Sequence, residues 1–537
     1  MKDEDAVRHL ISRYNAVKDR KNNWQNVWQE CADYVHPNRG DFSTKRWYGE
    51  KRTQLIFDAT APWALGQFAA GLHGFLTSPT QRWFTLTPKI RDWDDNLDLR
   101  EWLEETTEAL YEGVFNAPSS KWLQQSHEAY LDLGAFGNTI VFVNDLPGKP
   151  ITFSTFHLGE CSFAENDEGY VDTLFREYTR SASQLEERFG YENLPEELQK
   201  ELSKNPYKEY TVIQAVYPRN DWDPMSLAPQ SRRYASVFFM QKPLHIFPVS
   251  GYYEVPFAAA RWYKSSGEWY GRGPAMDSLP DIKMVNDMMK TVIKGAQKFV
   301  DPPLQMPDEG FIMPINLTPS AINYYRAGSK DRIEPILAPN AARPDLGLEM
   351  IDNRRQQIIR AFFADWMQLK EGPQMTATEV LQRQEDRMRL IGPMVGRMQS
   401  EFLGPIIQRV FSIAMRRGMI EPPPMNLEAI GGIRIEYTSP VVQAQKNVRL
   451  FTLARLFESI APIAQVKPEI LDNMDSDGVF KWVHHLLDAP MEALMRPEEV
   501  QKLRDDRAQQ QTTMMEAEAL RNAGAGMKSL MSANAGT

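Results

Sequence analysis

The sequence predicts a mainly helical protein with an α+β region in its N-terminal half. Apolar residues recur every three or four positions over most of the chain, as on one face of a helix. Between residues 138 and 264 this period gives way to short β-branched and aromatic runs, which favour strands. Hydrophobic residues make up 42% of the 537 residues and charged residues 25%, which is the composition of a folded globular protein.

Charge and hydropathy narrow the classes of function. The formal net charge is −10 at pH 7, whereas proteins that grip nucleic acid through many phosphate contacts are usually basic. This disfavours tight, general DNA binding but allows contact with DNA that keeps moving. Mean hydropathy is −0.48, and no run approaches the roughly 20 apolar residues of a membrane-spanning helix. The charged start, 1–5, is unlike a signal peptide, so we expect synthesis in a cytosol.

The N-terminal residues favour helices. Helical spacing extends over 3–35, where Asn22 and Asn23 leave open whether the run is one helix or two. Asp58 is a suitable N-cap for a second helix that continues to Leu76, and its many small residues predict close packing on a neighbour. Two more helices are predicted at 98–115 and 119–135.

The α+β region is predicted from its change of period. Ser183 with Glu186 has the spacing of a capping box for an acidic helix over 183–190, and a second acidic helix is predicted over 195–203. The expected strands cover 140–143, 151–156, 210–217 and 234–240.

A helical hairpin with a long insert at its tip is predicted in the middle of the chain. Residues 275–299 and 345–369 have helical periodicity, and the segment between them is rich in proline and has short sheet-like runs. Gly372 and Pro373 then require a loop over 370–375, because neither residue suits a helix interior.

The C-terminal part is predicted to be mostly helical. Thr376 and Glu379 have capping-box spacing, and the pairs at 392–393 and 404–405, each Gly-Pro, divide the following helices up to about residue 418. A strand is expected at 433–437, and a Gln- and Met-rich helix from about 498 to 522 before a small, polar tail.

One helix carries a distinctive charge pattern. Lysines recur along one stripe of the helix at 275–299, and the stripe is roughly 22 Å long at 1.5 Å per residue. Such a line is either an ordinary solvated face or a cationic edge beside a polyanion or an acidic neighbour. The stripe consists of Lys283, Lys290, Lys294 and Lys298.

Enzyme motifs are missing from the sequence. It has no P-loop, no G-x-S-x-G and no H-E-x-x-H, and its two cysteines, Cys31 and Cys161, are too few for a zinc cluster. We therefore expect no catalytic residues, no metal site and no cofactor.

Several short blocks, in this order, resemble the portal, or head-to-tail connector, proteins of short-tailed, T7-like bacteriophages. Each block is weak alone, but together they extend across most of the chain. They are WYGRGPAM at 269–276, LPDIK at 279–283, VDPP at 300–303, MTATEV at 375–380, LIGP at 390–393 with Gly396, Arg397, Gln399 and Glu401, YTSP at 437–440 with Ala444 and Gln445, and Pro490 with Arg496 and EEV at 498–500.

The resemblance implies the portal fold: a ring, usually of twelve subunits, with a wing, a two-helix stem, a clip, an inward tunnel loop and a helical crown. Carried over to this chain, the parts are the wing at 1–274, stem helices at 275–299 and 345–369, the clip at 300–344, the tunnel loop at 370–375, wing and crown helices at 376–497, and a C-terminal helix and tail at 498–537.

The resemblance also implies a function and partners. The ring would sit at one capsid vertex of the virion, be made in the bacterial cytoplasm, and conduct double-stranded DNA during packaging and ejection without sequence specificity. Its partners would be the terminase large subunit, head-tail adaptor and tail proteins, and the major capsid and scaffolding proteins.

Site residues follow from that assignment. The four lysines of the stripe become DNA-channel candidates, facing either phosphates or acids of an adjacent subunit. The tunnel-loop candidates are Lys370, Glu371, Gly372, Pro373, Gln374 and Met375. The alternatives are a capsid-shell or scaffolding protein, or a nuclease that uses carboxylate-bound metal.

Overall fold

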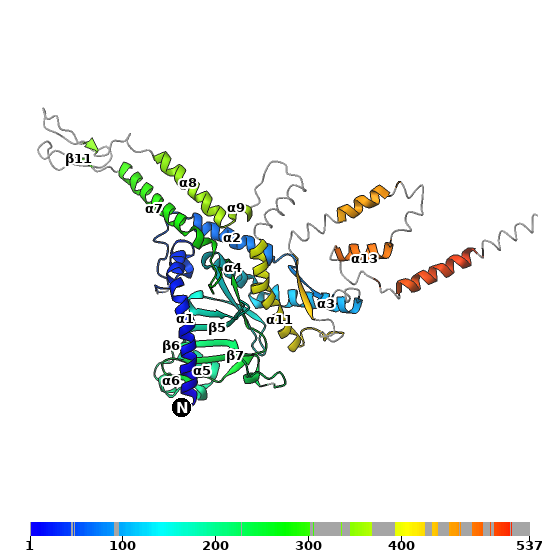
Figure 1. Ribbon diagram of the computed structural model, residues 1–537, viewed down its shortest axis with the longest axis horizontal. Coiled ribbons are helices and arrows are strands. Elements are labelled where there is room, and N and C mark those ends of the chain that lie inside the picture. Colours follow the sequence, from blue (N-terminus) through cyan, green and yellow to red (C-terminus); the bar gives the residue numbers. More distant parts are fainter. Residues whose placement is uncertain are drawn as a thin grey trace, which may run out of the picture. The chain divides into compact units, whose positions relative to one another are not determined.

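The computed structural model divides the chain into two compact units, residues 1–83 with 110–419 and residues 84–109 with 420–537 (Figure 1). The structure describes residues 2–44, 47, 49–90, 96–226, 228–300, 304–305, 334–335, 344–367, 392–424, 432–438, 450–460, 462, 475–486, 495, 499–515 and 517.

A six-stranded antiparallel sheet forms one half of the first unit. Its order is β4-β5-β6-β7-β8, and β9 pairs with the other end of β7. Helix α1 (Lys2–Tyr34) lies along one face, and helices α5 (Ala182–Phe189) and α6 (Glu196–Leu202) cover the other. The strands are β4 (Cys161–Glu165), β5 (Val171–Ser181), β6 (Glu209–Pro218), β7 (Tyr234–Met240), β8 (His245–Ile246) and β9 (Ser250–Tyr252).

Side chains on both faces of β6 and β7 are buried, which explains the long apolar runs in these strands. Ile213 and Phe239 pack with the apolar face of α1, which includes Leu10. Their neighbours Val212 and Phe238 point to the opposite face and pack with α5 and α6. Because successive side chains alternate between faces, a sheet covered on both sides needs apolar residues at nearly every position.

A three-stranded antiparallel sheet, β10-β2-β3, forms the other half of the first unit. Helix α4 (Trp122–Phe136) ends at Gly137, whose φ of 69° turns the chain directly into β2 (Asn138–Asn144). Helix α2 (Thr60–Leu76) crosses α4 at Gly134, where an added Cβ would lie 2.6 Å from Cδ1 of Leu65. The expected close packing of α2 is present, but the small residue at the crossing is Gly134 of α4, whereas Gly66 and Gly74 of α2 meet nothing within 4 Å. The remaining strands are β3 (Thr152–Phe156) and β10 (Phe257–Arg261).

The predicted helical hairpin is present and belongs to the first unit. Helices α7 (Pro274–Val300) and α8 (Pro344–Ala361) lie side by side and antiparallel (Figure 1). The helix expected over 345–369 is interrupted, because Phe363 has a φ of 55° and separates α8 from α9 (Ala364–Met367). Of the sheet-like insert, the structure describes one antiparallel pair, β11 (Leu304–Gln305) with β12 (Glu334–Pro335).

The structure settles one point that the sequence left open. Helix α1 is continuous through Asn22 and Asn23, because the buried face on either side overrides their modest helix propensity. The capping box predicted for α5 was wrong. The capping box of α5 uses Ser181 and Gln184, two residues before the predicted pair.

The expected division at 404–405 is also wrong. Helical backbone continues from 392 to 416 through a π-helical segment, Met398–Leu403, into α11 (Gly404–Arg416). Pro405 lacks an N–H, and the wider turn before it accommodates the missing bond without ending the helix.

The second unit contains a small sheet, one well-buried helix beside it and further helices with little burial. Strand β1 (Phe84–Pro88) pairs antiparallel with β13 (Ile433–Tyr437), which confirms the predicted strand, and α3 (Leu97–Leu110) packs beside them. The indole N–H of Trp102 donates to the carbonyl of Glu421 at 2.8 Å. The helices at 450–460 and 499–515 bury none of the side chains that the structure describes there; α13 (Ser476–Leu486) lies between them in sequence.

Candidate functional site: the helical hairpin and its base

The hairpin that carries the lysine stripe is held at its base by one short segment. The side-chain oxygen of Asn286 on α7 accepts the backbone N–H groups of Phe57 (2.8 Å) and Asp58 (3.1 Å). Asp58 in turn accepts hydrogen bonds from Arg355 on α8, the shorter at 2.6 Å. Although burial opposes ionisation, bonds from Thr60 and Arg355 hold the pKa of Asp58 below its usual value. Both helices are thus fixed to the chain just before α2.

The two helices also contact each other directly. Nη1 of Arg354 lies 3.0 Å from Oδ1 of Asp281. Further out, an added Cβ on Gly347 would lie 3.8 Å from Cγ2 of Val292. These two contacts fix which face of each helix is turned towards the other.

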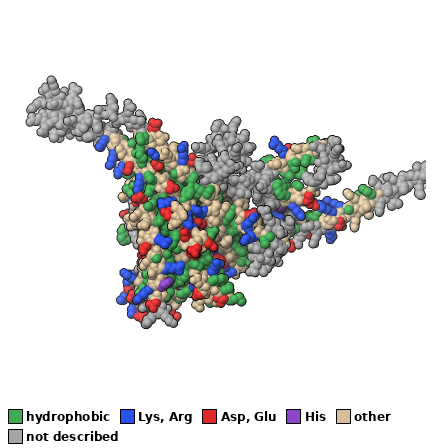
Figure 2. Space-filling model, in the orientation of Figure 1, with side chains coloured by type: hydrophobic (Ala, Val, Ile, Leu, Met, Phe, Trp, Pro, Cys, Tyr) green, Lys and Arg blue, Asp and Glu red, His purple; other side chains and the backbone are tan. Residues whose placement is uncertain are grey.

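The structure divides the predicted lysine stripe into two parts. Nζ of Lys283 lies 2.6 Å from Oε2 of Glu30 at the end of α1, and Lys290 lies 5.4 Å from the centre of the Phe57 ring. Lys294 and Lys298 are exposed on the outer turns of α7. In Figure 2, Lys and Arg side chains gather along this edge of the hairpin. The charge of Lys283 is therefore neutralised within its own chain, whereas Lys294 and Lys298 are exposed and accessible to a partner.

The remaining candidates lie outside the described residues. These are the whole of the predicted tunnel loop, 370–375, and the predicted clip except for the β11–β12 pair. Their roles stay predictions.

The chain enters α7 through a crossing of backbones that only glycine permits. An added Cβ on Gly273 would lie 2.7 Å from the nitrogen of Gly137 and 2.8 Å from the carbonyl oxygen of Leu133. The buried amide of Asn138 seals the crossing, because its oxygen accepts the N–H of Gly271 (2.7 Å) and its nitrogen donates to the carbonyl of the same residue (2.9 Å). The block at 269–276 thus clamps the start of the hairpin to the α4–β2 turn.

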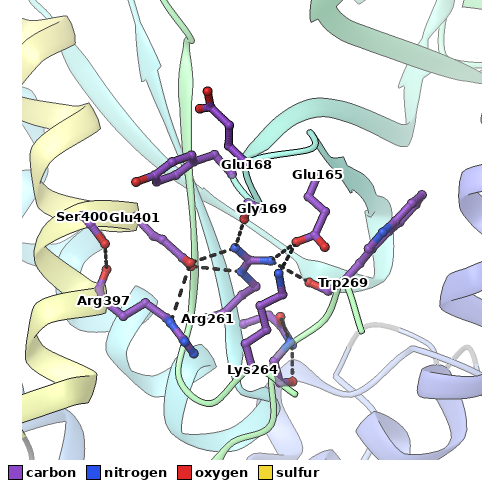
Figure 3. A network of polar contacts seen from close by, with 12 residues as sticks. Glu165, Glu168, Gly169, Arg261, Lys264, Trp269, Arg397, Ser400 and Glu401 are labelled. Carbon is purple, nitrogen blue, oxygen red and sulfur yellow. Dashed lines mark hydrogen bonds and ion pairs between the residues drawn. The ribbon is translucent and has the colours of Figure 1, made fainter. Parts of the chain in front are cut away.

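A buried guanidinium lies beside this clamp (Figure 3). Arg261, at the end of β10, is 1% exposed and makes a two-pronged contact with Glu401 on the π-helical segment, at 2.8 and 3.0 Å. It also binds Glu165 at the end of β4 (2.7 Å) and donates to the carbonyls of Gly169 (2.7 Å) and Trp269 (3.2 Å). One side chain therefore joins both sheets, the helix after residue 392 and the entry to α7.

Flanking charges complete this cluster. Lys264 binds Glu165 at 2.6 Å, and Arg397 lies 3.8 Å from Glu401. Burial alone would raise the pKa of Glu165, but bonds from Lys264 and Arg261 lower it below its usual value. Burial likewise opposes the charge on Arg261, and Glu401 and Glu165 overcome it, so that its pKa is raised. The positive and negative side chains of this cluster offset one another, and their contacts hold the two sheets, the π-helical segment and the entry to α7 in place.

Sequence reasoning did not single out Arg261 or Asn138. Arg261 ends an apolar run, where an arginine is expected to be exposed, and its acidic partners Glu165 and Glu401 are distant in sequence. The one available signal was Glu401, which belongs to the blocks of the family resemblance. Nothing local marked its partner.

Among the residues that the structure describes, no three His, Cys, Asp or Glu side chains come together as a metal site requires. Every helix that the structure describes is too short or too polar to cross a membrane.

Comparisons with known proteins give a consistent result. Residues 7–495 match the family model described as bacteriophage head to tail connecting protein. A probable portal protein of Bordetella phage BPP-1 is 29% identical over 98% of this chain and 95% of its own. The portal protein of Salmonella phage epsilon15 is 27% identical over 94% of this chain and 92% of its own.

Two solved structures give weaker matches. A chain from the virion of a native gene transfer agent particle has a TM-score of 0.36, 10% identity, and coverage of 77% of this chain and 91% of its own. A chain from the neck of the empty particle has a TM-score of 0.37, 10% identity, and coverage of 78% and 91%. Both scores are below 0.5.

Proposed function

Because the chain belongs to the bacteriophage head to tail connecting proteins, we propose that it is the portal protein of a phage capsid. The portal is a ring-shaped conduit at one capsid vertex, through which double-stranded DNA is packaged and later ejected. The observation that carries this conclusion is the extent of the family match, 7–495, together with the two phage relatives that match over nearly the whole chain.

The parts of the chain are assigned to the ring as follows. We propose α7 and the helices at 345–369 as the stem, 300–344 as the clip, 370–375 as the tunnel loop, and most of 1–274 as the wing, with the remaining helices in wing, crown and C-terminal parts. The hairpin supports the stem assignment, because it is fixed at its base and extends outward from there with exposed apolar side chains. These are Met284 (41%), Ile293 (40%), Leu348 (43%) and Met350 (52%).

The proposed partners follow from the position of a portal in a virion. The capsid and tail proteins contact it, and the terminase large subunit, a head-tail adaptor and the scaffolding protein are the finer assignments, for a short-tailed phage whose host makes the protein in its cytoplasm. We propose neither catalytic activity nor a cofactor.

Ring formation is the direct test of this function. We expect the purified full chain to form a closed particle of about twelve times the 61.7 kDa chain mass in native mass spectrometry, with a central hole in negative-stain images. The exposed apolar side chains of the hairpin give the physical reason, since a monomer would leave them in water. A stable monomer at micromolar concentration and physiological salt would contradict the proposal, and an empty shell would favour the capsid-shell alternative.

The loop at 370–375 gives a second expected result. Deleting 372–374 should leave rings intact but impair packaging or let DNA slip back, if this segment contacts DNA as a tunnel loop. Its composition supports sliding contact, because Lys370 and Glu371 offset each other and the segment has no aromatic residue for bases to stack on. The check is the length of DNA protected in filled capsids. Normal packaging and retention by the deletion variant would reject the assignment.

A further inference from the structure

The hairpin has two free edges of opposite charge. On α7 the residues turned towards α8 are Asp281 and Val292. At 100° per residue, Lys290 and Lys294 lie roughly 180° round the helix from them, on the edge that faces away from α8. The stripe is therefore a cationic outer edge of the whole hairpin.

The outer edge of α8 is acidic. Its residues turned towards α7 are Gly347 and Arg354, and the same helical geometry places Glu349 and Asp352 on the far side. Glu349 is exposed, and the Asp352 side chain is 69% exposed although it lies 2.9 Å from Arg355. On the outer turns, the hairpin therefore carries lysines along one edge and acids along the other, whereas nearer the base Asp287 shares the lysine edge and Arg360 the acidic edge.

The edges also match in height. The hairpin is antiparallel, with Asp281 beside Arg354 and Val292 beside Gly347, so Glu349 and Asp352 lie level with the part of α7 between those contacts. Lys290 falls in that part, and Lys294 follows one turn, about 6 Å, further out. A second copy placed alongside brings Lys290 of one copy close to the height of Glu349 of the other, while Asp352 lies about one turn nearer the base.

We propose that Lys290 and Lys294 of one subunit pair with Glu349 and Asp352 of the next. The two hairpin edges would then determine which surfaces of neighbouring copies meet in the ring. This inference rests on the proposed portal function and names the partner of the lysine stripe as a second copy of this chain. The interface is heterologous, since different surfaces meet, and repetition of such a contact closes a ring when the rotation allows it.

Charge complementarity favours this partner over DNA. Phosphates would account for the lysines but leave the acidic edge of α8 without a counterpart. Lys283, at the inner end of the stripe, already shows the preferred partner, because it binds a carboxylate, Glu30. The exposed apolar side chains Ile293 and Leu348 on the same outer turns suit a protein neighbour better than a polyanion.

Reversing one edge at a time tests the pairing. Full chains with Lys290→Glu and Lys294→Glu should fail to form rings at concentrations at which the wild type assembles, with the assembly midpoint raised about tenfold or more. Chains with Glu349→Lys and Asp352→Lys should fail in the same way. Mixing the two variants should restore rings in which they alternate, because each reversed edge then meets its opposite. The chain with all four substitutions should assemble alone.

Controls separate the possible outcomes. Lys200→Glu with Lys204→Glu, an equal charge change on exposed sites of α6 and of the turn that follows it, should leave assembly unchanged. Rescue on mixing shows that each variant is folded, since misfolded chains would not assemble with one another.

If wild-type rings form and the single-edge variants assemble equally well, the pairing is wrong while the portal function stands. If those variants form rings but lose packaged DNA, the stripe faces DNA instead. If wild-type chains form no ring, the proposed function itself fails.

Discussion

Replacing Gly273 by alanine should destabilise the first unit by about 3 kcal/mol or more, or prevent it from folding. The new Cβ would meet the nitrogen of Gly137 at 2.7 Å and the carbonyl oxygens of Leu133 and Gly134 at 2.8 and 3.0 Å. All three are backbone atoms, so no side chain can rotate away. The strain falls where the chain enters α7, and it can be relieved only by moving the hairpin away from the α4–β2 turn.

A glycine on the same helix provides the matched control. An added Cβ on Gly295 meets nothing within 4 Å, and alanine is the better helix former by up to about 1 kcal/mol. Gly295→Ala should therefore melt at or above the wild-type temperature in far-ultraviolet circular dichroism, whereas Gly273→Ala melts well below it or is insoluble. Equal melting of the two variants would show that the crossing is looser than the structure indicates.

The sequence predicted the helices better than the strands. The helical period located α2 and α7, because helix signals are local and repeat over many residues. The predicted N-cap of α2 was wrong by one residue, since Ala59 is the N-cap and Asp58 accepts the N–H of Thr60 from the position before it. Strand β5, the longest, was missed. Its partners β4 and β6 cover different parts of it, so its burial alternates only in places and is decided by contacts distant in sequence. The capping box of α5 lies two residues before the predicted pair, because Ser181 and Gln184 have the same spacing as Ser183 and Glu186. The box predicted at Thr376 and Glu379 lies outside the described residues.

The candidate site was predicted only in part. The lysine stripe and the hairpin follow from spacing along one helix. The clamp at Asn138 and the cluster at Arg261 do not, because both join segments more than a hundred residues apart, and no local pattern marks such a contact. The block at 269–276 was visible in the sequence as a motif, but its physical role as a close backbone crossing required the structure.

Replacing Arg261 by methionine should cost about 3 to 5 kcal/mol of unfolding free energy at pH 7, the range for breaking a buried ion cluster from one side. Methionine fills much of the arginine volume, so little of the loss comes from packing. The loss comes from the buried charges of Glu401 and Glu165, which no longer have the guanidinium between them, and from two backbone carbonyls that lose its hydrogen bonds. The stability of Arg261→Lys should lie between those of the wild type and Arg261→Met, because an ammonium keeps the charge but cannot make the two-pronged contact. Adding Glu401→Gln to Arg261→Met should recover part of the loss.

The pH dependence distinguishes this electrostatic origin from a simple packing defect. The folded pKa of Glu165 is lowered, so its contribution is complete above the unfolded value of about 4.3 and is lost as pH falls through the folded value. The stability difference between wild type and Arg261→Met should therefore be largest near neutrality and shrink on acidification. Arg8→Met, at an exposed position of α1, should change stability by less than about 0.5 kcal/mol at every pH. A difference for Arg261→Met that stays constant from neutral to acid pH would assign the loss to packing rather than to the charges that Arg261 holds together.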